Sequence, residues 1–247
     1  MNFADIHIHA LWGCDDGPET EAAMRQMVDM AYATGTRVLC LTPHYYPRHF
    51  GENSEKSRDA LACLQTYAAE AYPDLCLYPG NELRFSKGCD AWLESGACRT
   101  LNSGRCVLVD FQEGVSLSVL ENGLHRLLSL GYVPVLAHVE RYRALWGKTE
   151  LLRQLRGRAV KLQMDAGAPL GEFGAVCRLW SRWLLKNRLI DLVSSDGHDL
   201  KKRQPRMDRV WIFLKNKYGS GYAAALCRDN ALDCLGIADR KDEHDDG

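Results

Sequence analysis

The sequence predicts an α/β fold in which parallel strands alternate with helices and close into a barrel. Seven short apolar runs are separated by segments of helical periodicity, a pattern typical of parallel strands joined by crossover helices. That alternation also allows an open doubly wound sheet. However, polar residues of metal-binding type follow nearly every run, and neither a GxGxxG nor a Walker A motif gathers a site at one turn. This spread around the chain favours the barrel.

The seven candidate strands are rich in Val, Leu, Ile or Cys, and they are residues 3–9, 37–42, 75–79, 105–110, 133–138, 159–164 and 189–194. The first helix is expected after Gly17-Pro18, because proline suits the first turn of a helix. Apolar residues then follow at positions i, i+3, i+4 and i+7, namely Met24, Met27, Val28 and Ala31, and Gly35 ends the segment.

Four later segments repeat this helical period. Their apolar residues are Leu61, Leu64 and Ala68; Leu120, Leu124, Leu127 and Leu128; Leu151, Leu152 and Leu155; and Val176, Leu179, Trp180, Trp183 and Leu184. We expect Trp180 and Trp183, which belong to the last of these stripes, to be buried in the core.

Composition indicates a globular protein, and the irregular spacing of the cysteines favours the cytoplasm. The 247 residues are 46% hydrophobic and 26% charged, and no linker divides them, so residues 1–238 are expected to form a single domain with residues 239–247 as a charged, disordered tail. The net charge of −1 provides no basic field for nucleic acid or an anionic bilayer. Since no apolar run reaches the ~18–20 residues of a membrane span, no insertion into a membrane is expected.

The ten cysteines are irregularly spaced, with no Cys-x-x-Cys pair, which indicates reduced thiols rather than a disulfide framework. Cys234 and Arg240 have the Cys-x5-Arg spacing of thiolate phosphatases. That chemistry needs a helix N-terminus to hold the phosphate, whereas residues 235–239 end a helical pattern and enter the charged tail. We therefore expect no thiolate nucleophile there, and we expect Cys14 to serve packing.

Histidines and carboxylates gather at the carboxyl ends of the predicted strands. His7 and His9 are two apart on one strand and so project from one face, although such a pair alone is more often structural than a ligand pair. The other candidates follow later strands: Asp16, His44, Glu82, Asp110, His138, Asp196 and His198. In a parallel barrel these strand ends share the face that holds active sites.

These side chains are suited to a hydrolytic site with several metal ions. Histidine and carboxylate ligands without cysteine favour Mn, Fe or Zn, and nine candidates fill two or three sites, with Glu82 able to bridge two ions. Three divalent cations (+6) against four carboxylates (−4) would leave about +2, the complement of a phosphate dianion. Such ions would lower the pKa of water from ~15.7 toward ~7 and so supply a hydroxide for attack on a phosphoester.

Six segments resemble the signature blocks of the polymerase-and-histidinol-phosphatase (PHP) superfamily. They are Asp5-Ile6-His7-Ile8-His9, Gly13-Cys14-Asp15-Asp16-Gly17, Thr42-Pro43-His44, Gly80-Asn81-Glu82, Ala137-His138-Val139-Glu140-Arg141-Tyr142 and Ser195-Asp196-Gly197-His198. Within the superfamily the chain is most similar to the bacterial manganese-dependent protein-tyrosine phosphatases of the CpsB/YwqE type, over about residues 3–236.

This resemblance implies a distorted seven-stranded (β/α) barrel with two to three divalent metal ions, manganese first. It implies one ion held by His7, His9, Glu82 and Asp196, a second by Glu82, Asp110 and His138, and a third by Asp16, His44 and His198. The implied substrate is phosphotyrosine on the tail of a bacterial tyrosine kinase that regulates export of capsular or extracellular polysaccharide.

The chain departs from the family pattern at a few positions near the site. Asp110 stands where glutamate is usual, and Trp12, Val139, Gly197 and Asp199 replace other family residues, but no ligand type is lost.

Two arginines are candidates for holding the phosphate. The guanidinium groups of Arg141 and Arg203 present planar donors matched to two phosphate oxygens. Arg203 lies in a basic run that could also be a solvated face.

Three further roles remain open in the sequence. Asp5 could orient an imidazole or serve as a structural cap, and the aromatic side chains of Trp12, Tyr45 and Tyr46 could border a pocket for a phenyl ring or pack at the rim. A tyrosine phenolate leaves without a dedicated acid, since its pKa is near 10, and Asp199 is the only acid considered.

Two other functions remain as alternatives. One is a small-molecule phosphoesterase of the histidinol-phosphatase kind, with similar ligands and a different pocket. The other is a non-catalytic adaptor that binds phosphotyrosine, for which a complete set of ligands would be unnecessary.

Overall fold

Nine parallel strands make two sheets within residues 2–237, the part of the chain that the computed structural model describes. The smaller sheet has the order β1 (Phe3–Ile8), β2 (Thr36–Leu41), β4 (Cys76–Pro79). The larger sheet has the order β3 (His44–Tyr45), β5 (Glu82–Arg84), β6 (Cys106–Asp110), β7 (Val133–Leu136), β8 (Lys161–Asp165), β9 (Leu192–Ser194). The predicted tail, residues 239–247, and Arg240 lie outside the described residues.

Each predicted strand overlaps an observed one, and the second and third are each followed by a short strand that was not predicted. After β2, the strand β3 follows the break at Thr42-Pro43, where proline has no N–H for the ladder, and after β4, the strand β5 follows the break at Gly80-Asn81. The Asn81 side chain donates to the Pro43 carbonyl at 3.0 Å and joins the two interruptions. The α/β class with a curled parallel sheet is thus confirmed, whereas the strand pairing shows two sheets instead of one seven-stranded sheet.

The curl brings the first strand against the last one. Ile8 forms a bridge with Gly197, the N–H of His9 donates to the Gly197 carbonyl at 2.8 Å, and the N–H of Asp196 donates to the His7 carbonyl at 2.8 Å. The segment after β9 therefore lies beside the end of β1, which gives the strands a half-barrel arrangement.

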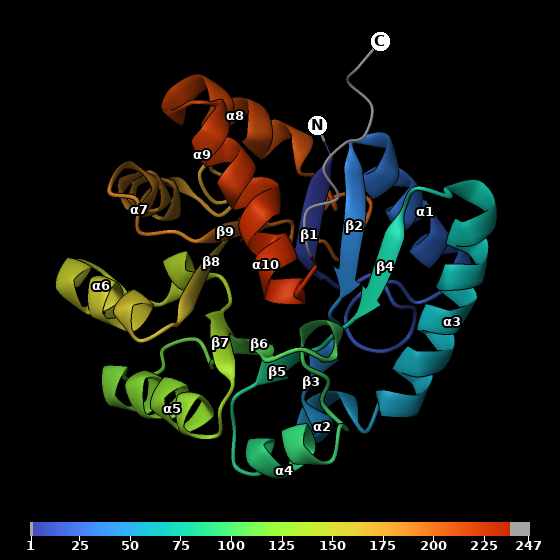
Figure 1. Ribbon diagram of the computed structural model, residues 1–247, viewed down its shortest axis with the longest axis horizontal. Coiled ribbons are helices and arrows are strands. Elements are labelled where there is room, and N and C mark those ends of the chain that lie inside the picture. The colour runs from blue at the N-terminus through green and yellow to red at the C-terminus, as the bar shows by residue number, and fades with distance from the viewer. Residues whose placement is uncertain (1, 238–247) are drawn as a thin grey trace.

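Helices surround these strands (Figure 1). They are α1 (Glu21–Ala33), α2 (Pro47–Phe50), α3 (Ser54–Ala71), α4 (Cys89–Glu94), α5 (Leu117–Ser129), α6 (Thr149–Gly157), α7 (Ala175–Lys186), α8 (Asp208–Tyr218), α9 (Ser220–Ala224) and α10 (Asn230–Leu235). Short helical turns add η1 (Leu101–Ser103), η2 (Val139–Arg141), η3 (Arg143–Leu145) and η4 (Ala225–Asp229). Within residues 2–237, no helix combines the length and apolarity that crossing a membrane requires.

The helical period predicts the buried face of α1 correctly and that of α7 only in part. All four predicted residues of α1 are buried, and Thr20 caps the helix by accepting from the Ala23 N–H. In α7 the buried residues are Ser181, Leu184 and Leu185, and Trp180 packs partly buried against the core. The rest of the predicted stripe is turned to solvent. Trp183 is consequently exposed rather than in the core. Ser181 can be buried because its hydroxyl donates to the Cys177 carbonyl at 2.7 Å.

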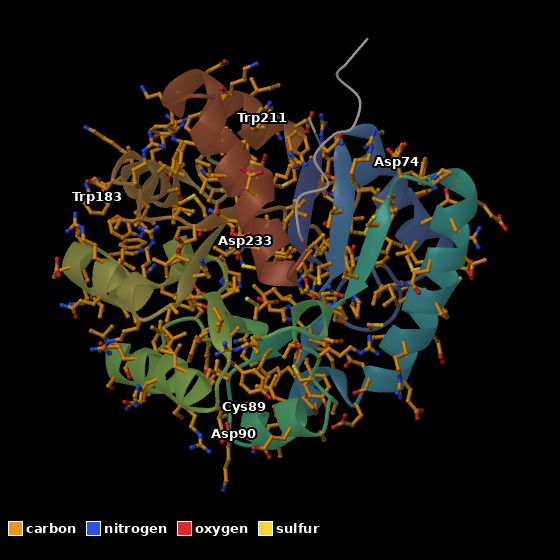
Figure 2. The ribbon with its side chains drawn as sticks, in the orientation of Figure 1. Asp74, Cys89, Asp90, Trp183, Trp211 and Asp233 are labelled. Carbon is orange, nitrogen blue, oxygen red and sulfur yellow. The ribbon has the colours of Figure 1, made fainter. Side chains whose placement is uncertain are left out.

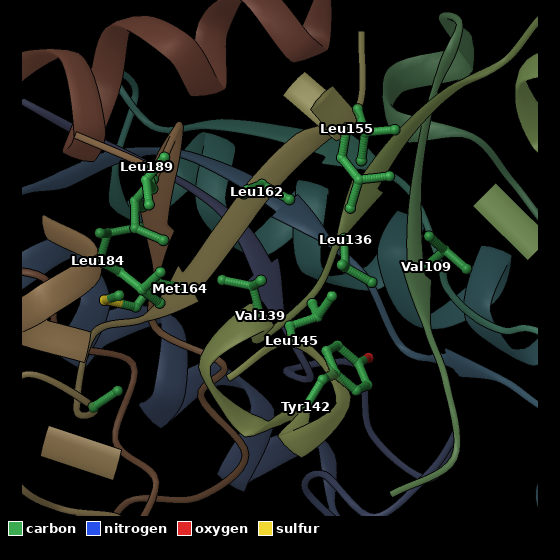
Figure 3. Packing of buried hydrophobic residues seen from close by; sticks show 14 of the residues in the cluster. Val109, Leu136, Val139, Tyr142, Leu145, Leu155, Leu162, Met164, Leu184 and Leu189 are labelled. Atoms are coloured by element: carbon green, nitrogen blue, oxygen red, sulfur yellow. The ribbon is translucent and has the colours of Figure 1, made fainter. Parts of the chain in front are cut away.

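The core packs on both sides of the strands. Outside them, Leu136, Leu162 and Met164 pack against residues of the surrounding helices and turns, including Val139 (Figure 3). Inside, a smaller cluster joins strand residues such as Ala4, Cys106 and Val133 to Ala231, Leu232 and Cys234 of α10. Since these strand residues lie near the amino ends of their strands, α10 covers that end and leaves the carboxyl ends for a site. All ten cysteines are free thiols, as expected.

Candidate metal centre

All nine predicted ligands lie together at the carboxyl ends of the strands, and the carboxylate of Glu82 is at their centre. His44 Nδ1 lies 2.8 Å and His9 Nε2 3.3 Å from Glu82 Oε2, while His138 Nε2 lies 3.0 Å and His7 Nε2 3.4 Å from Oε1. A buried carboxylate therefore faces four imidazoles.

The remaining four predicted residues extend this cluster in three directions. Asp196 Oδ1 lies 3.3 Å from His7 Nε2, and Asp110 Oδ1 lies 3.7 Å from His138 Nε2. Asp16 Oδ1 lies 3.4 Å from His198 Nε2 and 3.6 Å from His44 Nε2. Three overlapping groups of side chains could each hold a metal ion: His9, Asp16, His44 and His198; His7, His9 and Glu82; and His44, Glu82 and Asp110.

Strand register and two strained residues position these side chains. His44 on β3 lies directly opposite Glu82 on β5, so the interruption in each strand places their side chains side by side. His138 and Asp196 have φ values of 36° and 51°, in the left-handed region that residues other than glycine rarely adopt. The Gln163 side chain holds His138 in this conformation by accepting its backbone N–H at 2.7 Å.

Three histidines have one ring nitrogen hydrogen-bonded and the other free. Nδ1 of His9 pairs with Asp15 Oδ2 at 2.7 Å, Nδ1 of His7 with Gln163 Oε1 at 3.2 Å, and Nδ1 of His198 with the Asp196 carbonyl at 2.9 Å. In all three the buried Nε2 has no hydrogen-bond partner, and neither has Glu82 Oε2. Because buried polar atoms are normally paired, free Nε2 atoms converging on carboxylates fit a site for metal ions.

The side-chain hydrogen-bond partners of these imidazoles were not among the predicted residues. Asp15 directly precedes the predicted ligand Asp16, and Gln163 is a polar residue within an apolar run, so the sequence contains a weak indication of each. Asp15 also accepts the backbone N–H of His44 at 2.7 Å, which ties the loop after β1 to β3.

Charge within the cluster shifts the pKa of its members. Burial opposes protonation of His7, but Glu82 and Asp196 outweigh burial and raise the pKa of His7 to about 9. Burial likewise opposes protonation of His9, and Asp15 and Glu82 raise the pKa of His9 to about 10. Against the effect of burial, His44 and His7 hold the pKa of Glu82 well below its usual range. The carboxylate of Glu82 is therefore ionised and attracts cations.

A cavity of about 610 Å³ opens beside the cluster and contains both predicted arginines. Arg141 donates to Asp196 Oδ2 at 2.9 Å and contacts Asp165, and Arg203 also donates to Asp196. Two arginines that were not predicted, Arg84 and Arg143, also line the cavity, and Arg84 Nη2 lies 2.5 Å from Asp110 Oδ2. The guanidinium groups that face this cavity can bind an anion.

Aromatic side chains other than the predicted ones line this cavity, namely Phe111, Tyr142, Trp146 and Phe173. Of the predicted three, Tyr45 is buried and its hydroxyl donates to Glu52 at 2.7 Å, and Trp12 lies against Lys56, with the ammonium 5.7 Å from the ring. Tyr46 lies beside the cavity, 5.7 Å from the Arg84 guanidinium.

Three further residues have structural contacts. Asp5 accepts the backbone N–H groups of His7 and Ser195 at 3.2 and 3.1 Å, so it serves as a cap. Burial raises the pKa of Cys14 to about 12, which keeps its thiol protonated. Asp199 accepts the N–H groups of Lys201 and Lys202; against the effect of its partial burial, these donors lower its pKa, so as an ionised group it is a poor proton donor.

Comparison with known proteins agrees with this arrangement. The family described as "Capsular polysaccharide synthesis, CpsB/CapC" matches residues 3–236. The tyrosine-protein phosphatase CpsB of Streptococcus pneumoniae is 30% identical over 231 residues, covering 92% of this chain and 95% of that protein. The tyrosine-protein phosphatase YwqE of Bacillus subtilis is 28% identical over 216 residues, covering 87% and 85%.

A solved structure also superposes closely on this chain. It comes from a study of YwqE from B. subtilis and CpsB from S. pneumoniae, described as unique metal-dependent tyrosine phosphatases, and it matches with a TM-score of 0.85 and 27% identity over 96% of each chain. Together with the match along residues 3–236, this shows that the chain belongs to the CpsB/CapC family.

Proposed function

We propose that this protein is a metal-dependent phosphatase that hydrolyses phosphotyrosine in proteins. The observation that carries the proposal is the set of free, buried Nε2 atoms of His7, His9 and His198 around ionised carboxylates, beside a cavity lined with arginines. The relatives named as tyrosine-protein phosphatases support phosphotyrosine as the substrate.

The side chains offer ligands for two to three divalent ions. We assign His7, His9, Glu82 and Asp196 to one ion, Glu82, Asp110 and His138 to a second, and Asp16, His44 and His198 to a third. Imidazole and carboxylate ligands suit manganese, with iron and zinc as alternatives. When bound, such ions supply water of lowered pKa and positive charge opposite the phosphoryl oxygens.

Hydrogen bonds from neighbouring side chains orient these ligands for binding cations. The hydrogen bonds of His9 Nδ1 with Asp15 and of His7 Nδ1 with Gln163 direct each Nε2 at the centre, where a metal ion would replace the Nε2 proton. Asp110 is held by the Tyr142 hydroxyl at 3.1 Å and by Arg84, so its shorter side chain is fixed from two sides.

Arg141 and Arg203 act on the substrate phosphate in this proposal. Both guanidinium groups contact Asp196 and are partly exposed to the cavity, and the buried Nε of Arg203 has no hydrogen-bond partner. Planar donors placed in this way bind the nonbridging oxygens of a phosphate and stabilise the charge that develops on them. Phenolate is a good leaving group, so tyrosine leaves without a dedicated acid.

The fold, the domain organisation, the location and the substrate protein are assigned on the same basis. We propose that β2 with β3 and β4 with β5 count as two interrupted strands of a distorted seven-stranded barrel, and that residues 1–238 form one domain. We also propose the cytoplasm as its location, where thiols stay reduced, and the tail of a bacterial tyrosine kinase as its substrate.

Phosphate release tests the proposed function. Protein stripped of metal and reloaded with Mn²⁺ should hydrolyse a phosphotyrosine peptide and should prefer it to histidinol phosphate. His138→Ala should lose at least a hundredfold in kcat while retaining peptide binding. Preference for the aliphatic ester would indicate the small-molecule phosphoesterase, and peptide binding without turnover in the unsubstituted protein would indicate the adaptor.

A further inference from the structure

Helix α7 presents an apolar stripe to solvent. Val176 is 60% exposed, Leu179 67% and Trp183 36%, and their spacing of three and four residues places them on one face. Trp180 stacks on Trp183 with ring centroids 4.9 Å apart, and Figure 2 shows Trp183 at the periphery of the molecule beside α7. We call Val176, Leu179 and Trp183 the α7 stripe.

Exposed apolar side chains concentrate on this part of the chain. Seven large hydrophobic side chains are exposed within residues 2–237, and four of them lie between positions 173 and 183. Single exposed apolar residues are ordinary, but a contiguous group indicates a binding surface.

The α7 stripe begins at the rim of the arginine-lined cavity. Val176 belongs to the stripe and also lines the cavity, together with Phe173 and Trp146. The Arg141 guanidinium lies 4.7 Å from the centre of the Phe173 ring. A phosphotyrosine held by Arg141 would therefore have an apolar path for its flanking residues, over Phe173 and Val176 and along α7.

We propose that the α7 stripe binds apolar side chains of the polypeptide that carries the phosphotyrosine. This inference rests on the proposed function and adds a sequence preference to it. Val176 and Trp183 are seven residues apart, or roughly 10 Å at ~1.5 Å per helical residue. That length matches about three residues of extended peptide at ~3.3 Å each, so the preferred apolar residues lie within a few positions of the phosphotyrosine.

The size and position of the stripe favour a peptide over a second copy of the chain. A stable dimer buries ~800 Å² on each partner with about 20–30 residues per side. The α7 stripe has three side chains in a row, which suits a single extended segment, and its continuity with the cavity gives that segment an anchor.

Kinetics with two classes of substrate test the inference. Leu179→Ser should raise KM roughly tenfold for a phosphotyrosine peptide with leucine at the three positions on either side, and kcat should stay unchanged. The same variant should hydrolyse p-nitrophenyl phosphate like the unsubstituted protein. A peptide with serine at those positions should show no difference between the two proteins.

A matched control separates the stripe from exposed apolar residues in general. Val119→Ser removes a side chain that is 50% exposed on α5, outside the cavity lining, and should change neither substrate's kinetics. Equal losses on both substrates, or unchanged peptide kinetics in Leu179→Ser, would overturn the inference while leaving the proposed function intact. A dimer of the unsubstituted protein that Leu179→Ser dissociates, seen by sedimentation, would assign the stripe to a second copy. Failure of the unsubstituted protein to hydrolyse any phosphotyrosine would overturn both proposals.

Discussion

Arg84 Nη2 lies 2.5 Å from Asp110 Oδ2, and the parallel register of β5 with β6 places the two residues directly opposite one another. Burial raises the pKa of Asp110, and the nearby charges of His138 and Arg84 only partly offset that effect. Among the four carboxylates proposed as ligands, Asp110 is thus the one whose pKa is raised, whereas the pKa values of Asp16, Glu82 and Asp196 are lowered. Arg84 stabilises the ionised form that a metal ligand requires.

Replacing Arg84 should therefore weaken both metal binding and catalysis. In Arg84→Gln, the lost charge-assisted hydrogen bond is worth about 1.5–3 kcal/mol, so kcat/KM for a phosphotyrosine peptide should fall about 10- to 150-fold. Part of the activity should return at high Mn²⁺. The control is Arg37→Gln, which removes a half-buried arginine near the start of β2 that pairs with Asp74 at 2.9 Å and contacts no residue of the cluster. A normal kcat/KM in Arg84→Gln would show that Asp110 needs no such support.

Asp15→Asn should lower metal affinity without removing a ligand. Asp15 accepts from His9 Nδ1 and from the His44 backbone N–H, and loss of such a partner typically costs 10- to 100-fold in metal affinity. Calorimetric titration of metal-free protein with Mn²⁺ measures this directly. Asp74→Asn, at an exposed aspartate paired with Arg37, should bind Mn²⁺ normally. Equal affinity in the two variants would rule out a role for Asp15 in orienting His9.

The positions of the ligands were predictable because they depend on topology. Polar residues at the ends of parallel strands must share one edge, so Glu82 and His138 could be placed together although they are 56 residues apart. The partners of the imidazoles depend on side-chain rotamers and on loop geometry, which sequence spacing does not determine. Gln163 is found only when β8 is seen to place its amide beside both His7 and the backbone of His138.

The errors in the fold prediction have a similar origin. Periodicity shows that α7 has apolar faces, but Leu184 belongs to the buried face and Leu179 to the exposed one, and the choice between them depends on how the helix packs. The breaks after β2 and β4 were also missed, because proline and glycine at the end of an apolar run read equally well as the end of a strand.

Gly17→Ala should disturb the cluster through the backbone. A Cβ at Gly17 would lie 2.2 Å from the His9 carbonyl oxygen, a distance that only a shift of the loop or of the end of β1 can relieve. Since the same loop carries Asp15 and Asp16, we expect weaker Mn²⁺ binding and at least a tenfold lower kcat. Gly221→Ala is the control, because Gly221 lies in α9 with nothing within 4 Å of the added atom. Wild-type behaviour of Gly17→Ala would mean that the loop can move without affecting the ligands.

Without metal, the free energy of unfolding should fall as pH rises, whereas the extra stability that metal confers should grow. In the metal-free protein the pKa values of His7 and His9 are raised to about 9 and about 10, from the ~6.5 of an unfolded chain. The folded state then binds more protons than the unfolded state, so this stabilisation is complete below about pH 6.5 and is lost as pH rises through 9 and 10. The free energy of unfolding in EDTA should therefore fall between pH 7 and 9.

Metal ions compete with these protons, so the extra stability conferred by Mn²⁺ should grow over the same range. Urea titrations at several pH values, with EDTA or with Mn²⁺, measure both trends. His125→Gln, which changes a histidine of α5 outside the cluster, should reproduce both slopes, whereas His7→Gln should flatten them. A metal-free protein whose stability rises from pH 7 to 9 would contradict the assignment of protonated, carboxylate-bound imidazoles to the empty cluster.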